Sequence, residues 1–404
     1  MEEWTVMHPT ETLRGTKSHA LEGKRIVLGI TGSIAAVECF ELARELIRHG
    51  AEVHAAMSPS ALDLMTPWTM EFATANEVIE ELDGRVQHVA LLGDVPDRAD
   101  LLLIAPCTAN TISKIAHGID DTTVTTMATV ALGSKVPIII APAMHLTMYQ
   151  NALVQRNVQS LRDLGVGFVG PRVEGKKAKV AEVQEVVSAV LRRLGKHDYL
   201  GQRVLVIGGS SEERIDEMRV ISNRGTGQTA VQLALSAYHR GAEVELWMGR
   251  CTAPIPSYIT TKRFTSVADL LGMVDDIDHQ IVIVPAALSD YTIKPVKGKI
   301  PSGKPELVLK LSPTPKVLEA IRKKECILVG FKAEYHVGDR ELAKRARARL
   351  STVPLDLIVA NDLKDVGAAG TKALLISKKN VRTFAGTKAE LAECILDEVL
   401  GLGK

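Results

Sequence analysis

Short aliphatic runs alternate along this chain with longer stretches whose apolar positions recur at helical spacing. The runs predict buried strands at residues 25–31, 51–57, 101–105 and 136–141, and again at residues 203–207, 243–248, 281–285, 327–331 and 355–360. Continuous aliphatic runs of this length are typical of parallel strands that are covered on both faces. The pattern therefore predicts an α/β protein with two doubly wound, mainly parallel sheets.

The amphipathic stretches predict helices at residues 34–49, 108–117, 122–132, 146–164, 183–194 and 227–240. A polar connector follows residue 194, and the strand pattern restarts at Arg203. We therefore expect a loose N-terminal extension at 1–23, a first domain at 24–195, a linker at 196–202 and a second domain at 203–404. The segment 294–305 is rich in Lys, Pro and Gly, so we expect it to be a loop.

Composition excludes several classes of protein. No apolar run approaches the roughly 18 residues of a membrane helix, and the polar N-terminus lacks the apolar stretch of a signal peptide. The net charge of +1 argues against a protein built around nucleic acid. The five cysteines are scattered without a CxxC pair, which argues against a thiolate metal site and against a disulfide framework. A reducing, cytoplasmic setting is expected.

Charge is unevenly distributed between the two halves. Residues 1–195 hold 18 Lys and Arg against 23 Asp and Glu, and the remainder holds 31 against 25. The second half is the better candidate for a polyanionic small ligand, although random surface charge explains so small an imbalance equally well.

A glycine turn follows the first predicted strand and opens a helix at Gly32, Ser33 and Ile34. Exposed amides at a helix start favour a phosphate there. The full GxGxxG motif is absent, and the second strand ends at Ser58 instead of an acidic residue. The turn therefore disfavours a dinucleotide and favours a single phosphate, as in FMN, while a purely structural turn is an equal alternative.

Other polar residues follow the later strands of the first half. Thr108 and Asn110 lie at a helix start, Met144 can pack against a flat ring, and His88 precedes an apolar stretch. Parallel strands end at one edge, so these residues are expected to converge there. Taken alone, His88 is more often structural than catalytic.

The segments 29–36, 88–89, 105–111 and 141–144 together resemble the flavin-dependent cysteine decarboxylases. The resemblance implies a flavodoxin-like domain that binds FMN, usually in trimers with the flavin at a subunit interface. It implies that FMN oxidises a cysteinyl thiol, that carbon dioxide leaves and that the electrons return, with His88 as the acid–base residue. The implied cofactor-binding residues are Gly32, Ser33, Ile34, Ser58, Thr108, Asn110, Ala143 and Met144.

Two positions depart from that family. His145 replaces an Asn that holds the substrate carboxylate, and a histidine can also donate a hydrogen bond to it. Lys179 stands where the family has a proton-donating Cys, within the flap stretch 175–180. Lys179 is either the replacement proton donor or a solvated loop charge.

The second half carries two glycine turns, 208–211 and 221–227, and polar residues after three later strands. Two such turns at one sheet edge make a nucleotide cleft plausible, although neither is a Walker loop. The segments 219–227, 286–291, 329–334 and 358–362 together resemble phosphopantothenate–cysteine ligase, which has a Rossmann-like domain.

That resemblance implies attack of a pantothenate carboxylate on CTP, followed by displacement of CMP from the acyl-cytidylate by the amine of cysteine. It implies catalytic roles for Asn223 and for Lys299 of a mobile flap, here Lys299-Ile300-Pro301-Ser302-Gly303-Lys304. Mg²⁺ would offset the triphosphate charge, without a dedicated protein metal site. The implied substrate-binding residues are Arg219, Ala286, Asp290, Phe331, Lys332, Glu334, Asn361 and Asp362, together with His145 of the first half.

The order of the two halves resembles the bifunctional ligase and decarboxylase family of coenzyme A biosynthesis. It implies that 4′-phosphopantothenate, cysteine and CTP are the substrates and 4′-phosphopantetheine is the product. It also implies a homo-oligomer of flavin-domain trimers and ligase-domain dimers, compatible with a dodecamer, without nucleic-acid or membrane partners. Two alternatives stay open, namely a ligase whose decarboxylase half is impaired and a non-enzymatic regulatory protein of the same fold.

Overall fold

In this computed structural model the described residues are 7–175, 177–303, 305–365, 367 and 370–402. The chain divides into two compact units whose boundary falls between Gly195 and Lys196. In the part of the chain that the structure describes, no helix combines the length and the apolar character needed to cross a membrane.

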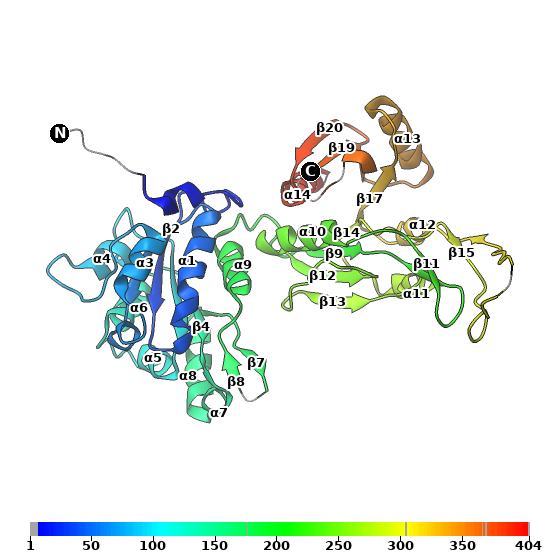
Figure 1. The fold of residues 1–404 in the computed structure, drawn as a ribbon. Helices are drawn as coiled ribbons and strands as arrows, with labels where there is room; N and C mark the ends of the chain where they lie inside the picture. The colour runs from blue at the N-terminus through cyan, green and yellow to red at the C-terminus, as the bar shows by residue number, and fades with distance from the viewer. Residues whose placement is uncertain (1–6, 176, 304, 366, 368–369, 403–404) are drawn as a thin grey trace. The chain divides into compact units, whose positions relative to one another are not determined.

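A five-stranded parallel sheet organises the first unit (Figure 1). Its order is β2 (Glu52–Met57), β1 (Arg25–Ile30), β3 (Leu101–Cys107), β4 (Ile138–Pro142) and β6 (Gly167–Phe168). Every neighbouring pair is parallel. This is the flavodoxin-like strand order, in which ligands bind where the order reverses, between β1 and β3.

Helices cover both faces of this sheet. One layer holds α1 (Cys39–Arg48), α3 (Pro67–Thr74) and α9 (Val183–Leu194), and the other holds α5 (Ala109–Ala116), α6 (Thr123–Gly133) and α8 (Ala152–Asp163). The smaller elements are η2 (Ile34–Glu38), α2 (Pro59–Leu62), α4 (Gln87–Leu92), α7 (Leu146–Tyr149), β5 (Met144–His145), β7 (Arg172–Glu174) and β8 (Lys177–Lys179). The aliphatic runs are therefore buried on both sides, as their pattern predicted.

The described part of the N-terminal extension, residues 7–23, packs against the rest of the first unit, which corrects the expectation of a loose segment. It begins with η1 (Pro9–Leu13), after which the N–H groups of Gly15 and Leu21 donate to carbonyls at the end of α1 at 3.1 and 2.9 Å. Leu21 is fully buried. These contacts join segments far apart in sequence, so the local pattern could not reveal them.

An eight-stranded sheet organises the second unit. Its order is β13 (Thr260–Arg263), β12 (Glu243–Met248), β9 (Arg203–Gly208), β14 (Ile281–Val284), β17 (Ile327–Glu334), β18 (Leu357–Asp362), β19 (Thr371–Ser377) and β20 (Val381–Gly386). The first six strands are parallel and follow the Rossmann order 3-2-1-4-5-6. The last two are antiparallel.

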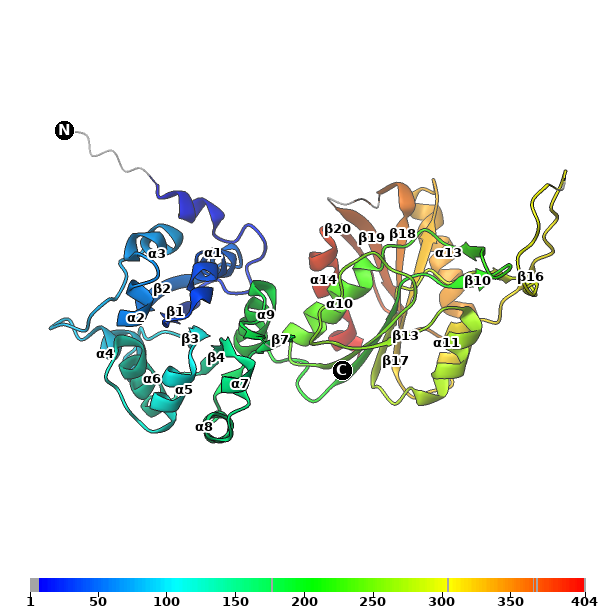
Figure 2. The same ribbon diagram turned by 60° about the horizontal axis from the view of Figure 1, so that its bottom comes forward.

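Figure 2 shows helices on both sides of this sheet. α10 (Gln228–His239) and α14 (Lys388–Leu402) share one core with it, and α11 (Val267–Met273), α12 (Val317–Ile321) and α13 (Asp339–Thr352) share the other. The remaining elements are η3 (Val274–Asp276), η4 (Leu363–Asp365), the hairpin strands β10 (Glu212–Arg214) and β11 (Val220–Ser222), and the pair β15 (Tyr291–Thr292) and β16 (Ser312–Pro313).

The structure departs from the predicted elements in several further places, since the helices α3 and α11 to α14 and the strand β13 were also not predicted. The helix expected at 146–164 is split into α7 and α8, because Asn151 has an extended backbone and its side chain caps α8 through the N–H of Leu153. The antiparallel strands β19 and β20 were not predicted. Both add an edge to a sheet whose central strands the aliphatic pattern identified.

Candidate functional site

The turn after β1 lies at the switch point of the first sheet. Thr31 joins the ends of β1 and β3, because its hydroxyl donates to Pro106 O at 2.8 Å and accepts from the N–H of Thr108 at 3.1 Å. A Cβ on Gly32 would lie 2.4 Å from Ser60 Cβ, so only glycine fits there. The hydroxyl of Ser33 accepts from the N–H of Ala35 and starts η2. This turn is held in a fixed shape before any ligand arrives.

Several predicted cofactor residues meet at this edge. Ser58 is buried directly after β2, and its N–H donates to Ile30 O at 3.0 Å. Thr108 caps α5 through the N–H of Thr111 at 3.2 Å, with Asn110 exposed in the first turn of that helix. The donors at this edge are neutral hydroxyls and backbone amides, which suits one phosphate group at a helix start.

The end of β4 meets the predicted flap. The N–H of Ala143 donates to Cys107 O at 2.9 Å, and Met144 and His145 then pair with Ala178 and Lys177 of β8. β8 pairs with β7, which places Lys179 opposite Arg172. The structure therefore brings His145 and the flap hairpin together, while Lys176 of the same stretch lies outside the described residues.

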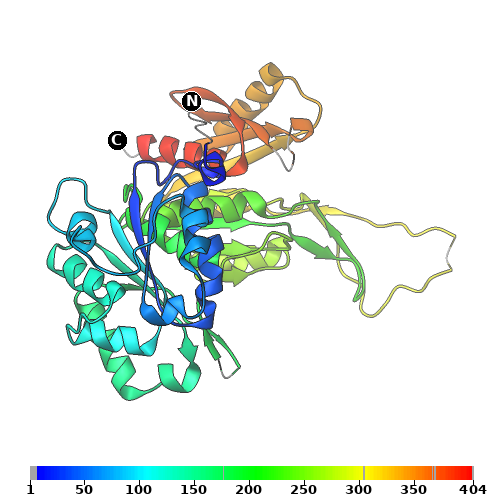
Figure 3. The ribbon, with the colours of Figure 1, turned by 60° about the vertical axis from the view of Figure 1, so that its left-hand side comes forward.

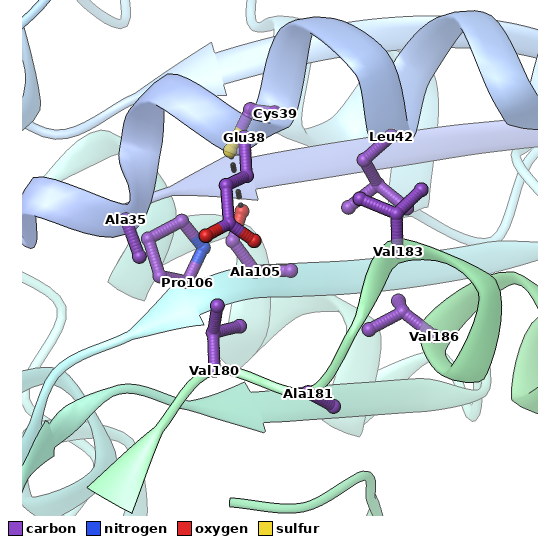
Figure 4. A pocket seen from close by; sticks show the side chains of 10 residues that line it. All are labelled: Ala35, Glu38, Cys39, Leu42, Ala105, Pro106, Val180, Ala181, Val183 and Val186. Atoms are coloured by element: carbon purple, nitrogen blue, oxygen red, sulfur yellow. Dashed lines mark hydrogen bonds between the residues drawn. The ribbon is translucent and has the colours of Figure 1, made fainter. Parts of the chain in front are cut away.

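A narrow apolar pocket lies beside the same edge (Figure 4). The side chains that line it are Ala35, Glu38, Cys39, Leu42, Ala105, Pro106, Val180, Ala181, Val183 and Val186. The thiol of Cys39 donates to Ala105 O at 3.1 Å, and burial raises the pKa of the Cys39 and Cys107 thiols. Both therefore stay neutral, and neither replaces the thiol that the flap lacks.

His88 lies apart from the turn, in α4, which packs on α6. Its Nδ1 atom is buried and has no hydrogen-bond partner among the described residues. The preceding Val86 has a φ of 48°, a strained conformation for a β-branched residue. Backbone strain next to an unpaired ring nitrogen is more typical of a functional residue than of a structural histidine.

In the second unit, three segments meet beside β9. Asn223 donates its amide hydrogens to Ala287 O at 3.1 Å and Leu288 O at 3.0 Å. Ser211 of the first glycine turn accepts from the N–H of Ser289 at 2.9 Å. The structure thus brings together the two glycine turns and the segment that contains Ala286 and Asp290.

The turn 208–211 also contains an unpaired hydroxyl. Ser210 is fully buried, and its Oγ atom has no hydrogen-bond partner among the described residues. A Cβ on Gly225 would lie 2.5 Å from that oxygen, so the second glycine turn approaches the first closely. A side chain at residue 225 would therefore have to displace the Ser210 hydroxyl.

Asp290 is exposed and is paired with Lys316 at 2.6 Å. Its backbone carbonyl accepts from the N–H of Thr314 at 3.0 Å, which ties the segment to β16. Sequence patterns did not identify Lys316, because a lone lysine near a strand gives no signal.

The end of β17 carries a charged cluster. Glu334 lies between Lys332 at 3.1 Å and Arg345 of α13 at 2.9 Å. Burial alone would raise the pKa of Glu334, but these two cations outweigh it and lower the pKa. Phe331 is half-buried and packs against the core shared with α10 and α14. Arg345 was not predicted, because α13 is too polar for its apolar spacing to be recognised.

The last predicted residues differ in their surroundings. Asp362 is buried, and its carboxylate accepts N–H groups of His336, Val337 and Lys364 at 2.7 to 3.1 Å. These contacts hold the loop after β17, instead of leaving the carboxylate open to a substrate. Asn361 is half-buried beside Ala333.

The predicted basic loop is docked on the β10–β11 hairpin. The N–H of Val296 donates to Ile215 O at 2.9 Å, and Gly298 O accepts from the N–H of Glu217 at 3.2 Å. Lys299 is the next residue and is exposed, whereas Lys304 lies outside the described residues. Arg219, in the same hairpin, pairs with buried Asp216.

Comparison with known proteins covers nearly the whole chain. The Flavoprotein family model matches residues 14–195, and the model of the DNA/pantothenate metabolism flavoprotein C-terminal domain matches residues 199–402. The coenzyme A biosynthesis bifunctional protein CoaBC of Thermococcus kodakarensis is 44% identical over 403 residues, 98% of this chain and 99% of that protein. That of Methanocaldococcus jannaschii is 40% identical over 407 residues, 99% of each.

A crystal structure of the DNA/pantothenate metabolism flavoprotein from Streptococcus pneumoniae is 29% identical, covers 50% of this chain and 99% of that chain, and has a TM-score of 0.45. The full-length relatives and the two family models show that this chain belongs to the family of coenzyme A biosynthesis bifunctional proteins, CoaBC.

Proposed function

We propose that this chain joins 4′-phosphopantothenate to cysteine at the expense of CTP and then decarboxylates the product to 4′-phosphopantetheine with FMN. The observation that carries this proposal is full-length family membership together with a candidate site in each unit, at the carboxyl ends of that unit's parallel strands. The product of the ligase half is the substrate of the flavin half, which gives the fusion a chemical logic.

FMN fits the edge of the first sheet. The donor set there is neutral and includes Ser33, Ser58, Thr108 and the backbone of Gly32 and Ile34, which suits one phosphate. Ala143, Met144 and Asn110 would also hold the cofactor, and the Met144 side chain is of a type that packs against a flat ring. When bound, FMN would withdraw electrons from the cysteinyl thiol and later return them.

Three residues of the first unit would handle protons and the substrate carboxylate. His88 would act as the acid–base residue, and its unpaired Nδ1 supports that role. His145 would donate a hydrogen bond to the carboxylate before carbon dioxide leaves. Lys179, on the hairpin that pairs with Met144 and His145, would supply the proton that the missing flap cysteine supplies in the flavin-dependent cysteine decarboxylases.

The ligase half would activate the pantothenate carboxylate as an acyl-cytidylate and then release CMP to the amine of cysteine. Asn223 would orient the acyl group, and its fixed amide supports that role. Arg219 and Lys299 would neutralise developing negative charge. The nucleotide would be held by Ala286, Asp290, Phe331, Lys332, Glu334 and Asn361, with Asp362 holding the adjoining loop.

Mg²⁺ would enter with the nucleotide. Among the described residues no group of three or more His, Cys, Asp and Glu side chains is arranged to hold a metal ion. Mg²⁺ often binds through substrate phosphates and one or two carboxylates, so this arrangement fits a nucleotide-borne ion.

We also propose a homo-oligomer in a reducing, cytoplasmic setting. The large apolar side chains of Ile34 and Val37, which directly follow the candidate phosphate turn, and of Trp68 in α3 are 77%, 60% and 78% exposed. Trimers of the flavin unit would cover such side chains, and ligase dimers would extend the assembly towards a dodecamer. The five cysteines are all free thiols, which supports the reducing setting.

One experiment tests the whole proposal. The purified chain is examined for a flavin spectrum and is then given 4′-phosphopantothenate, cysteine, Mg²⁺ and either CTP or ATP. We expect pyrophosphate release with CTP and the mass of 4′-phosphopantetheine as the end product. Accumulation of 4′-phosphopantothenoylcysteine would show that the flavin half is impaired. Faster turnover with ATP than with CTP would show that ATP is the preferred nucleotide.

A further inference from the structure

Asp216 lies in the β10–β11 hairpin, and its carboxylate is completely buried. One oxygen accepts the N–H groups of Met218 and Arg219, both at 2.7 Å. The other oxygen accepts from the guanidinium of Arg219 and from the N–H of Ile300 at 3.0 Å. A buried charge is tolerated when it is paired and hydrogen-bonded in this way. The two segments that it joins are 84 residues apart in sequence.

The loop that contains Lys299 lies along this hairpin, as Figure 3 shows. The two residues that flank Lys299 are both bonded to the hairpin, Gly298 through its carbonyl and Ile300 through its N–H. Ile300 is also buried. One bond from the Asp216 carboxylate reaches the loop, at the N–H of Ile300, and the guanidinium of Arg219 also donates to Ile300 O at 3.4 Å. Charge-assisted hydrogen bonds are about twice as strong as neutral ones, so these two bonds strengthen the docking beyond the neutral backbone bonds.

We propose that Asp216 is a positioning residue of the ligase reaction, which holds the Lys299 loop and the Arg219 side chain in one fixed arrangement. The inference rests on the proposed function of the ligase half. In the proposed function, the Lys299 and Arg219 side chains act on the same charged substrates. A misplacement of either side chain by about 1 Å can lower the rate roughly 100-fold. A loop docked during folding also avoids the entropy of ordering at each turnover.

Asp216→Asn tests this role with little change to the hairpin. The remaining oxygen still accepts the N–H groups of Met218 and Arg219, whereas the new NH₂ group faces two donors, the Arg219 guanidinium and the Ile300 N–H. We expect amide exchange at 296–300 to rise and kcat for pyrophosphate release to fall roughly 10- to 100-fold. Flavin content and decarboxylation of supplied 4′-phosphopantothenoylcysteine should be unchanged.

Two further variants keep the test specific. Glu217→Gln removes a neighbouring exposed carboxylate that pairs with Arg214, and it should alter neither exchange nor turnover. Ile300→Pro removes the N–H donor from the loop side and leaves the Asp216 carboxylate in place. It also replaces a buried side chain and restricts the backbone of Lys299, so its effects should be at least as large as those of Asp216→Asn. It also serves if Asp216→Asn fails to fold.

A melting temperature that falls while kcat and KM per folded protein stay unchanged would make Asp216 merely structural and overturn the inference. Unchanged exchange, or raised exchange with normal turnover, would also overturn it. Failure of the proposed function would be distinguishable from these outcomes. In that case the chain without any substitution would release no pyrophosphate with CTP or ATP.

Discussion

The flavin half and the ligase half both place their candidate sites at the carboxyl edge of a parallel sheet, but they hold their loops in different ways. In the flavin half the turn is fixed by neutral groups, chiefly the Thr31 hydroxyl between Pro106 and Thr108. In the ligase half, buried carboxylates fix the loops. Glu213 accepts from the N–H of Val267 and the hydroxyl of Thr292, and Asp216 accepts from Ile300.

This difference follows from charge. A neutral turn of hydroxyls and amides suits one phosphate. In the ligase half the buried carboxylates are engaged by backbone N–H groups of the loops, while Lys299 is exposed, which suits the more highly charged substrate that we propose for this half. Buried carboxylates near a proposed anion site therefore need not weaken anion binding, because their negative charge is taken up by hydrogen bonds from the protein's own backbone.

The largest expected effect separates the chemistry of the two halves. His88→Asn should lower carbon dioxide release by about 10²- to 10⁴-fold, the usual contribution of a general acid–base residue. Pyrophosphate release should be unchanged, because His88 lies in the other unit. The two products are measured in the same assay, with His117→Asn, an exposed histidine at the end of α5, as the control. Surviving decarboxylation would make His88 structural.

Asn223→Asp should give the reciprocal result. The new carboxylate would face the carbonyls of Ala287 and Leu288, to which the amide now donates. Ligation should fall about 100-fold, while supplied 4′-phosphopantothenoylcysteine is still decarboxylated. Asn380→Asp makes the same substitution in an exposed turn and should leave ligation intact. Normal ligation by Asn223→Asp would remove this residue from the site.

Gly32→Ala probes the neutral turn itself. The added Cβ would meet Ser60 Cβ at 2.4 Å and Ser60 O at 3.0 Å, which costs about 1–3 kcal/mol when neither can move. We expect flavin content per chain, read from the visible spectrum, to fall while ligation persists. Gly133→Ala, where a Cβ meets nothing within 4 Å, is the matched control. Full flavin content would show that the turn does not bind the cofactor.

Lys179→Gln tests the exchange of a cysteine for a lysine in the flap. If Lys179 delivers a proton, decarboxylation should slow by roughly 10-fold, less than for His88→Asn because water can substitute as a donor. Product masses before and after the reductive step would locate the block. Unchanged turnover would assign Lys179 to a loop charge.

The smallest effect concerns stability. Burial alone would raise the pKa of Glu45, but its hydrogen bonds to Lys17, Gln184 and Arg48 outweigh this and lower the pKa from 4.5 to about 2. The contribution of Glu45 is therefore present above pH 4.5 and is lost as the pH falls through about 2.

Glu45→Gln should accordingly lower the melting temperature of the flavin unit at pH 7 by roughly 5 °C, for about 2 kcal/mol lost in a domain of this size. The difference should shrink as the pH falls towards 2, and the ligase unit should be unaffected. Flavin fluorescence during heating reports the transition. A difference that stays constant with pH would contradict the ionic origin.

The sequence by itself determined the central strands, most helices that cover the first sheet, α10 of the second, and the strand ends where polar residues gather. Strand and helix periodicities are local, and aliphatic runs such as 203–207 have few other stable environments. The motifs that resemble known families indicated the family of this chain, and they identified Gly32, Asn223 and Lys299 as candidate site residues.

Only the tertiary structure decided how those residues are held. The contact between Asp216 and Ile300, the docking of Leu21 and the pairing of His145 with the flap all join segments distant in sequence. The tertiary structure also showed that the Asp362 carboxylate accepts hydrogen bonds from backbone N–H groups and that Cys39 and Cys107 are buried. Such hydrogen bonds depend on which loops meet after folding, and this information is absent from any local pattern.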